Sequence, residues 1–305
     1  MRSESSSGHT LNADLPMSRL ARLRWIGLNW RNNSAARKNV DQGLILTRFA
    51  AGGLDEFWTR IDPTVSPARR LCDLFWLSLP WTKVAAALGG TVRVLEIGCG
   101  SGRYGELLRD CLGGAFGGYR GLDVVRDEAW PALQRDPRFE FVCAGSDATA
   151  QYAGDANLIF TQSALEHFEG DMTFFRQLQT HIAGAGRPVL QLHLIPSAGC
   201  LRTFLWHGVR QYTPRTTSHI TGLFGADCGK LLYALGGARC NRLHRRYVTW
   251  PWLFGRGDRR RQTTALYDAQ LREAIRLDDA APAAAEACFY ALALLHGVPG
   301  EILPP

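Results

Sequence analysis

The sequence predicts an α/β fold with a mostly parallel sheet flanked by helices, on three observations. The stretch Val92–Tyr104, VRVLEIGCGSGRY, has the pattern of a buried strand, a glycine turn and the start of a helix. Short apolar runs that suit strands then alternate with helix-like segments as far as residue 195. Finally, 46% apolar and 21% charged residues are globular values, so a chain of 305 residues should bury a substantial core.

The glycine turn is the most informative part of this pattern. Glycine is expected where the backbone turns sharply and approaches a ligand closely, as it does under nucleotide-like cofactors in open α/β sheets. The dinucleotide fingerprint would place its third glycine at position 103, where this chain has Arg103. A phosphate-binding P-loop is excluded because no Gly-Lys-Ser/Thr follows. An ordinary glycine-rich turn is the alternative.

Residues 94–102, VLEIGCGSG, resemble the first motif of the class I S-adenosylmethionine (AdoMet) dependent methyltransferases, which have a Rossmann-like fold. The resemblance implies that the glycine loop lies beneath the methionine and ribose of AdoMet. It also implies that Glu96 fixes the loop or the methionine ammonium group. The cofactor-binding residues expected in this segment are Glu96, Gly98, Cys99, Gly100, Gly102 and Tyr104.

The next two strands supply further cofactor contacts. Asp123 ends the strand predicted over 119–124 and stands 21 residues after Gly102, where nucleotide-binding sheets place a carboxylate for the ribose hydroxyls. Val124 is its neighbour. After the strand predicted over 139–143, the resemblance places Asp147 and Ala148 at the adenine, whereas a capping role in a turn is the alternative for Asp147.

The fourth predicted strand, 157–161, leads into Gln162-Ser163-Ala164-Leu165-Glu166-His167. This segment resembles the x-x-L-E-H loop of small-molecule O- and C-methyltransferases, which lies between cofactor and acceptor. Gln162 and Ser163 are therefore expected at the cofactor. Histidine titrates near neutral pH and suits a general base, so His167 is the predicted base. His193, near the end of the strand at 188–195, is a second base or an acceptor contact; each histidine could instead be structural.

The segments outside the core have weaker signals. Residues 1–15 are expected to form a mobile tail, residues 16–89 an N-terminal helical cap, and residues 90–195 the AdoMet-binding core. Residues 196–260 are expected to be an acceptor-side insertion with the final strand or strands, and residues 261–305 C-terminal helices. In detail, helices are predicted over 16–35, 40–60, 66–89, 171–182, 227–235, 264–277 and 282–295, and a sixth strand over 239–248.

Trp206 to Tyr212 is dense in side chains that bind sugars, phosphates or aromatic rings. Three of them are predicted acceptor contacts alongside His167 and His193, namely His207, Arg210 and Tyr212. The net charge of +7 is uneven, because residues 202–261 carry twelve basic and two acidic residues. This suggests either an anionic acceptor or surface, or only a solvated arginine-rich face. Residues 16–35 suit a basic helix on a membrane surface or one packed on the domain.

No Cys-x-x-Cys pair or zinc-like spacing occurs among the eight cysteines, and no apolar run is long enough to span a membrane. A cytoplasmic protein without a metal is therefore expected. The leading hypothesis is O-methylation of a small molecule or glycan, including nucleotide-linked or lipid-linked sugars. An RNA methyltransferase is an alternative, although no appended RNA-binding module is visible. A third is a protein of this fold that binds without turnover.

Overall fold

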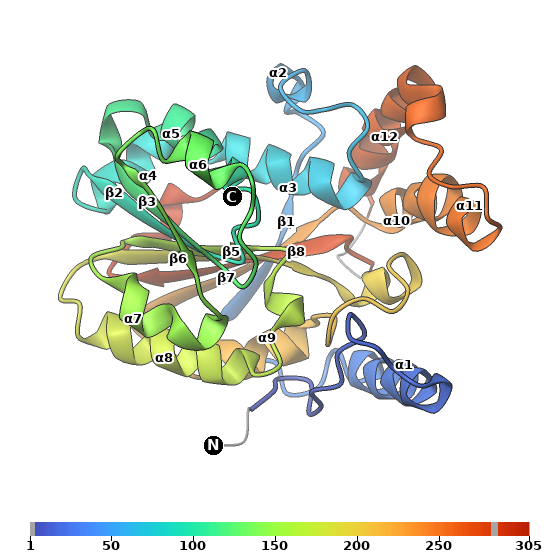
Figure 1. Ribbon diagram of the computed structural model, residues 1–305, viewed down its shortest axis with the longest axis horizontal. Coiled ribbons are helices and arrows are strands. Elements are labelled where there is room, and N and C mark those ends of the chain that lie inside the picture. The colour runs from blue at the N-terminus through green and yellow to red at the C-terminus, as the bar shows by residue number, and fades with distance from the viewer. Residues whose placement is uncertain (1–3, 282–285, 305) are drawn as a thin grey trace.

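The computed structural model describes residues 4–281 and 286–304, in which one sheet of eight strands lies between two layers of helices (Figure 1). The strand order is β1-β7-β8-β6-β5-β2-β3-β4, and β8 alone runs antiparallel to its neighbours. The strands are β1 Leu44–Phe49, β2 Val92–Ile97, β3 Phe116–Asp123, β4 Phe139–Cys143, β5 Leu158–Gln162, β6 Val189–Pro196, β7 Cys228–Leu235 and β8 Phe289–His296.

This topology confirms the predicted fold class. The order in which the chain adds strands to the sheet reverses between β2 and β5, which are parallel neighbours. The loops after these two strands therefore diverge and leave a crevice at their carboxyl ends. β8 lies antiparallel between β6 and β7. An additional strand, β1, extends the sheet by pairing in parallel with β7.

The helices form one layer on each face of the sheet (Figure 1). The helices α3, α4, α5, α10 and α12 cover one face, and α7, α8 and α9 cover the other. Their bounds are α1 Arg19–Ser34, α2 Asp55–Trp58, α3 Pro67–Ser78, α4 Trp81–Ala87, α5 Arg103–Leu112, α6 Trp130–Leu133, α7 Thr149–Ala153, α8 Asp171–Ala183, α9 Pro214–Thr221, α10 Ala238–His244, α11 Trp250–Leu253 and α12 Thr264–Asp279.

Four predicted elements are wrong. The predicted helix 227–235 coincides with β7, and residues 289–295 of the predicted helix 282–295 lie in β8. Residues 44–49 of the predicted helix 40–60 form β1. Central strands buried on both faces read as continuous apolar runs, which periodicity cannot distinguish from buried helices. Residues 238–244, within and before the predicted sixth strand, form α10. The start of the predicted C-terminal helix, residues 282–285, lies outside the described residues.

The N-terminal segment differs from the predicted mobile tail in its described part, residues 4–15. The Ser6 backbone N–H donates to Asp171 Oδ1 at 2.8 Å, and the Ala13 N–H donates to the Gly208 carbonyl at 2.8 Å. Arg210 donates to the hydroxyl oxygens of Ser5 and Ser7. These bonds fix the segment against the start of α8 and against the 203–212 loop.

Candidate active site: two adjoining cavities

A cleft of about 640 Å³ lies at the carboxyl ends of β2, β3, β4 and β5. Its volume is in the range of small-molecule and cofactor sites. Seven residues predicted for the cofactor or catalysis line it: Gly98, Gly100, Asp123, Val124, Asp147, Ser163 and His167. Sequence reasoning missed the opposite wall, which comes from Phe168–Gly170 and from α8 through Thr173, Phe174 and Gln177.

The glycine loop packs directly against the loop after β5. Gly98 has φ +76°, and a Cβ atom there would overlap the Cβ of Ala164. The Gly98 and Cys99 N–H groups both donate to the Leu122 carbonyl, at 2.8 and 3.0 Å, which fastens the loop to β3. Only glycine satisfies both the conformation and the close approach.

Asp123 organises the loop from the end of β3. Its Oδ2 accepts a hydrogen bond from the Gly100 N–H at 2.8 Å, and its Oδ1 accepts one from the Val125 N–H at 3.2 Å. A carboxylate has about four lone-pair positions, so two of them stay free toward the cleft. Asp123 can therefore accept two hydroxyl protons of a sugar without releasing the loop.

The other residues predicted for the cofactor do not line the cleft. Gly102 has φ +81° at the start of α5, where a Cβ would meet Phe141. Tyr104 is buried and donates to Asp73 of α3 at 2.7 Å. Gln162 accepts from the Trp76 indole N–H at 3.0 Å. These residues support the cleft from behind, and Cys99 and Ala148 are likewise outside its lining.

Glu96 is buried beneath the glycine loop. Its carboxyl group accepts a hydrogen bond of 2.5 Å from the Tyr119 hydroxyl. Burial raises the pKa of Glu96 to about 8, although the Tyr119 hydrogen bond opposes the shift. The carboxyl group therefore acts as part of the packing between β2 and β3 and does not reach the cleft.

A second cavity of about 190 Å³ adjoins the cleft, and Ser163 lines both. An engineered protein cavity of about 150 Å³ holds benzene, so this one has room for a group the size of one substituted ring. Its walls combine apolar side chains with a cation and an acid. They include Ser66, Arg69, Glu166, Cys200, Phe204, His207 and Phe289.

Glu166 is the most unusual group in the second cavity. Its side chain is buried, and its Oε2 has no hydrogen-bond partner among the described residues. Burial raises the pKa of Glu166 to about 7, which the charge of His167 partly offsets. An unpartnered buried carboxyl oxygen is costly unless a ligand supplies a donor. Sequence reasoning did not select Glu166, although it lies inside the LEH segment.

Arg69 of α3 supplies a cation of this cavity. Its guanidinium donates to the Tyr104 hydroxyl at 2.7 Å and belongs to a network in which Asp73 also binds Arg103 at 2.6 Å. The network joins α3 to α5. Nothing in the sequence distinguishes Arg69 from other helix arginines, because only the packing of α3 brings it to the cavity.

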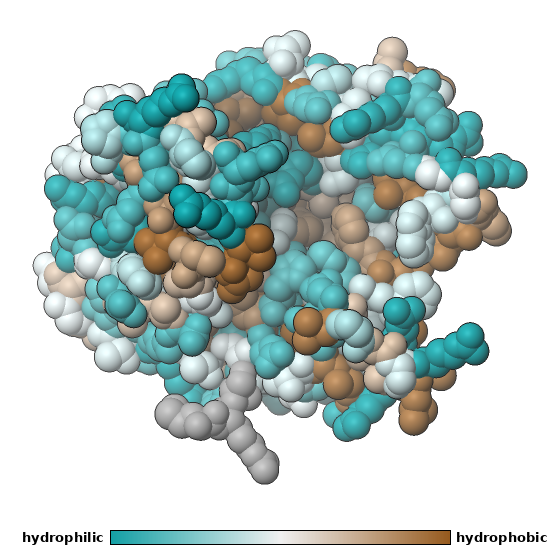
Figure 2. All heavy atoms as spheres, in the orientation of Figure 1, coloured by the Kyte–Doolittle hydropathy of each residue, from teal (hydrophilic) through white to brown (hydrophobic). Residues whose placement is uncertain are grey.

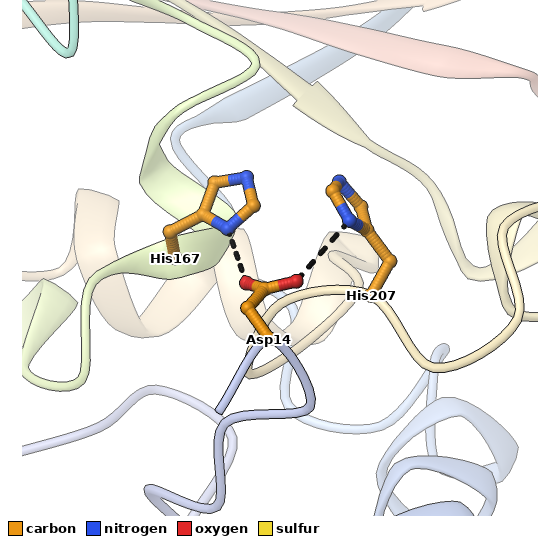
Figure 3. Close-up of side chains that lie close together, drawn as sticks. All are labelled: Asp14, His167 and His207. Atoms are coloured by element: carbon orange, nitrogen blue, oxygen red, sulfur yellow. Dashed lines mark hydrogen bonds and ion pairs between the residues drawn. The ribbon is translucent and has the colours of Figure 1, made fainter. Parts of the chain in front are cut away.

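Asp14 lies between His167 and His207, the second unexpected contribution of the N-terminal segment (Figure 3). Its Oδ2 is 2.6 Å from His167 Nδ1, and its Oδ1 is 3.4 Å from His207 Nδ1. Burial alone would raise the pKa of Asp14, but hydrogen bonds from the Gly208 N–H and from His167 hold it below its usual value. Because a carboxylate only accepts, His167 carries its proton on Nδ1 and leaves Nε2 free to act as a base.

The same three residues are types that bind Zn²⁺, and their ligand atoms lie within 4.8 Å of one another. Two atoms bound tetrahedrally to one zinc ion at about 2.1 Å lie about 3.4 Å apart. The 2.6 Å separation of His167 and Asp14 is shorter and is that of a charge-assisted hydrogen bond. The observed arrangement is therefore a hydrogen-bonded pair, with His207 beside it.

Three other residues predicted for the site make their polar contacts elsewhere in the fold. His193 is fully buried against Phe174 and Phe175, bonds to Thr161 and Gln191, and has a pKa lowered to about 3 by burial. Tyr212 is buried and donates to the Leu165 carbonyl. Neither lines a cavity, so neither can contact an acceptor there. Arg210 touches the second cavity, but its guanidinium binds the Phe168 and Glu169 carbonyls and pairs with Asp171.

No protein-family model and no curated protein matches the sequence. Among solved structures, the chain is similar to the plantazolicin methyltransferase BamL in complex with a triazolic desmethylPZN analog and SAH (11% identity, 79% of this chain and 88% of that chain, TM-score 0.43). It is also similar to Burkholderia thailandensis 1,6-didemethyltoxoflavin-N1-methyltransferase (13%, 93% and 92%, TM-score 0.40) and to a putative sarcosine dimethylglycine methyltransferase from Galdieria sulphuraria (11%, 73% and 84%, TM-score 0.44).

Proposed function

We propose that the protein is an AdoMet-dependent methyltransferase that acts on a small molecule. The observation that carries this proposal is the fit of the cleft to a nucleoside with a charged amino-acid arm. The glycine loop lines it through Gly98 and Gly100, Asp123 offers two free lone-pair positions for sugar hydroxyls, and Asp147 also lines it. Free cysteines, together with this cofactor, suit a reducing, cytoplasmic location.

The second cavity would hold the reacting end of the acceptor. When bound, AdoMet supplies a methyl group on a positively charged sulfur, ready for in-line displacement. The shared wall at Ser163 brings the two cavities together, so an acceptor in the smaller one can approach the methyl group from one side. Arg69 would bind an anionic substituent, and the Glu166 carboxyl would accept a hydrogen bond from a hydroxyl or amine.

His167 is the proposed general base. Asp14 holds its Nδ1, so Nε2 can take the proton of the acceptor as the new bond to the methyl carbon forms and the bond from sulfur breaks. The electron pair of the broken bond stays on sulfur, which loses its positive charge. The geometry suits an oxygen acceptor and also a nitrogen acceptor, and O-methylation of a ring hydroxyl or a sugar is the narrower form of the proposal.

Calorimetric titration with AdoMet and S-adenosylhomocysteine tests the proposal. Micromolar binding that falls at least about tenfold in Asp123→Ala is expected, because two charge-assisted hydrogen bonds would be lost. Glu128→Ala is the matched control, since Glu128 is an exposed acid in the loop that follows β3 and does not line the cleft. Absence of binding by the native protein, or equal binding by both variants, would contradict the proposal.

A further inference from the structure

Two helical elements expose apolar side chains among arginines, and neither feature is explained by the methyltransferase site. The first is α1. Its inward face carries Trp25, Asn29 and Asn32, with the indole N–H of Trp25 and the amide of Asn29 bonded to the carbonyls of Gly208 and Val209. Its outward face is the apolar one: Leu20 is 77% exposed, and Leu23 and Trp30 are each 66% exposed.

These three side chains share one face of the helix. Positions 20, 23 and 30, with Gly27 between them, follow the three- and four-residue steps that place residues on one face of a helix. Exposed arginines border the stripe on both sides, at positions 19, 24 and 31. An apolar stripe that faces away from the protein between cationic borders is typical of helices that lie in the plane of a membrane surface.

The second element is the tip formed by α11 and the loop after it. Trp252 is 61% exposed, Phe254 is 75% exposed, and Trp250 and Leu253 are about half exposed. The surrounding exposed cations are Arg242, Arg246, Arg256, Arg259 and Arg261. These residues belong to the 202–261 segment, whose net charge is +10 from twelve basic and two acidic residues.

The 203–212 loop joins the two elements and also lines the acceptor cavity. The guanidinium carbon of Arg22 in α1 lies over the Trp206 ring, 5.9 Å from the ring centroid. The Thr249 hydroxyl, next to α11, donates to the Thr203 carbonyl at 2.7 Å. Phe204 and His207 of the same loop line the cavity. Hydrophobic residues mixed with hydrophilic ones appear on the same side of the molecule, near α1 and α11 (Figures 1 and 2).

We propose that α1 and the α11 tip dock together on an anionic lipid bilayer. Tryptophan, phenylalanine and leucine enter the interface, and the flanking arginines bind lipid phosphates. The choice of a bilayer follows from charge, because a second copy of the chain would bring two strongly basic faces together. No helix among the described residues is long and apolar enough to cross a membrane. If the protein is a methyltransferase as proposed above, docking implies that the methyl acceptor is part of an amphiphilic molecule in that bilayer.

Sedimentation with vesicles tests docking without any enzymatic step. Vesicles of three parts phosphatidylcholine to one part phosphatidylglycerol are expected to bind the protein, and vesicles of phosphatidylcholine alone are expected to bind it at least about tenfold less. Binding should fall again at about 0.5 M NaCl, where the screening length is only a few ångströms. Equal binding to both vesicles, or to neither, would overturn the proposal.

Variants locate the surface. Trp252→Ser with Phe254→Ser, and separately Leu20→Ser with Leu23→Ser, should each weaken binding at least about tenfold. Ile45→Ser with Leu46→Ser is the matched control, because both side chains are exposed on β1, and it should bind like the native protein. If light scattering shows a dimer that the Trp252/Phe254 variant dissociates, the occupant is a second copy and the proposal fails. Calorimetry with S-adenosylhomocysteine on the same samples distinguishes failure of docking from failure of the proposed function.

Discussion

The cofactor cleft and the acceptor cavity are built in different ways. The cleft comes mainly from consecutive strand ends of one sheet, over residues 97–177. The second cavity and the neighbouring Asp14–His167 hydrogen bond, which we propose serve the acceptor, draw on Asp14, Arg69, Glu166 and His207, which are spread over nearly 200 positions of the chain. The first can therefore be recognised from local sequence. The second exists only after the N-terminal segment, α3 and the 203–212 loop have packed together.

The largest expected effect concerns the acceptor side. His167→Ala should lower kcat by about 10²–10⁴, the usual contribution of a general base, while S-adenosylhomocysteine binds within a few fold of native. Glu166→Gln keeps the shape of the side chain and should act mainly on KM, because the proposed role of Glu166 is to hold the acceptor. Steady-state kinetics on an identified acceptor provide the measurement. The reverse pattern, a loss of kcat in Glu166→Gln alone, would move the base to Glu166.

The cofactor side gives a comparable test of the glycine loop. Gly98→Ala should weaken S-adenosylhomocysteine binding by about 100-fold, because the new methyl group meets Ala164 and must displace the loop after β5. Gly89→Ala is the matched control. Gly89 also has a positive φ, +88°, but no atom lies within 4 Å of the place that a Cβ would occupy, so the substitution adds strain without a clash. Similar S-adenosylhomocysteine affinities for the two variants would contradict the claim that Gly98 is required because the glycine loop lies so close to Ala164.

The sequence predicted the cofactor half more completely than the rest, and specific residues show why. Gly98, Gly100, Asp123 and Asp147 lie at strand ends whose order follows from local patterns, and all four line the cleft. Asp14 could not be selected, because nothing local indicates that a polar N-terminal segment packs beside His167. His193 was misassigned because a strand end predicts the edge of the sheet but not which way the side chain points.

The prediction of the final strands was wrong for a related reason. Residues 289–296, FYALALLH, have seven buried side chains out of eight, since β8 lies between β6 and β7 and is covered on both faces. Alternation disappears in such a strand, and alanine with leucine then favours a helical interpretation. Conversely, Cys240, Leu243, His244 and Tyr247 are buried at helical spacing in the segment that was expected to be a strand.

A smaller effect on the acceptor side concerns Asp14. Asp14→Asn removes the carboxylate that fixes the His167 tautomer, so kcat should fall by about 10–100-fold, less than in His167→Ala. Asn12→Ala serves as the control for disturbance of the N-terminal segment. Equal losses of kcat in Asp14→Asn and Asn12→Ala would assign Asp14 a purely structural role.

The cofactor side has its own pH-dependent group in Glu96. Burial raises its pKa from 4.5 to about 8, so the folded protein binds a proton that the unfolded chain releases at lower pH. Stability should therefore fall as pH rises from about 4.5 to about 8, by up to about 5 kcal/mol. Glu96→Gln should be more stable than the native protein at pH 8 and similar at pH 5. Denaturant unfolding at pH 5 and pH 8 checks this prediction. If the difference in unfolding free energy between Glu96→Gln and the native protein is the same at both pH values, Glu96 is not protonated in the folded protein.

The smallest effect is expected from treatment with a chelator, which tests whether Asp14, His167 and His207 hold a metal ion. If Asp14 binds His167 as a hydrogen-bond acceptor, dialysis against EDTA should leave kcat and the melting temperature unchanged. The native protein and His207→Ala should then respond in the same way to added Zn²⁺, and neither should bind one equivalent at this site. Loss of activity on chelation with recovery by one equivalent of Zn²⁺ would instead mean that the three side chains separate around an ion. In that case the proton of the acceptor would be removed with the help of a metal, and the His167 assignment would have to be withdrawn.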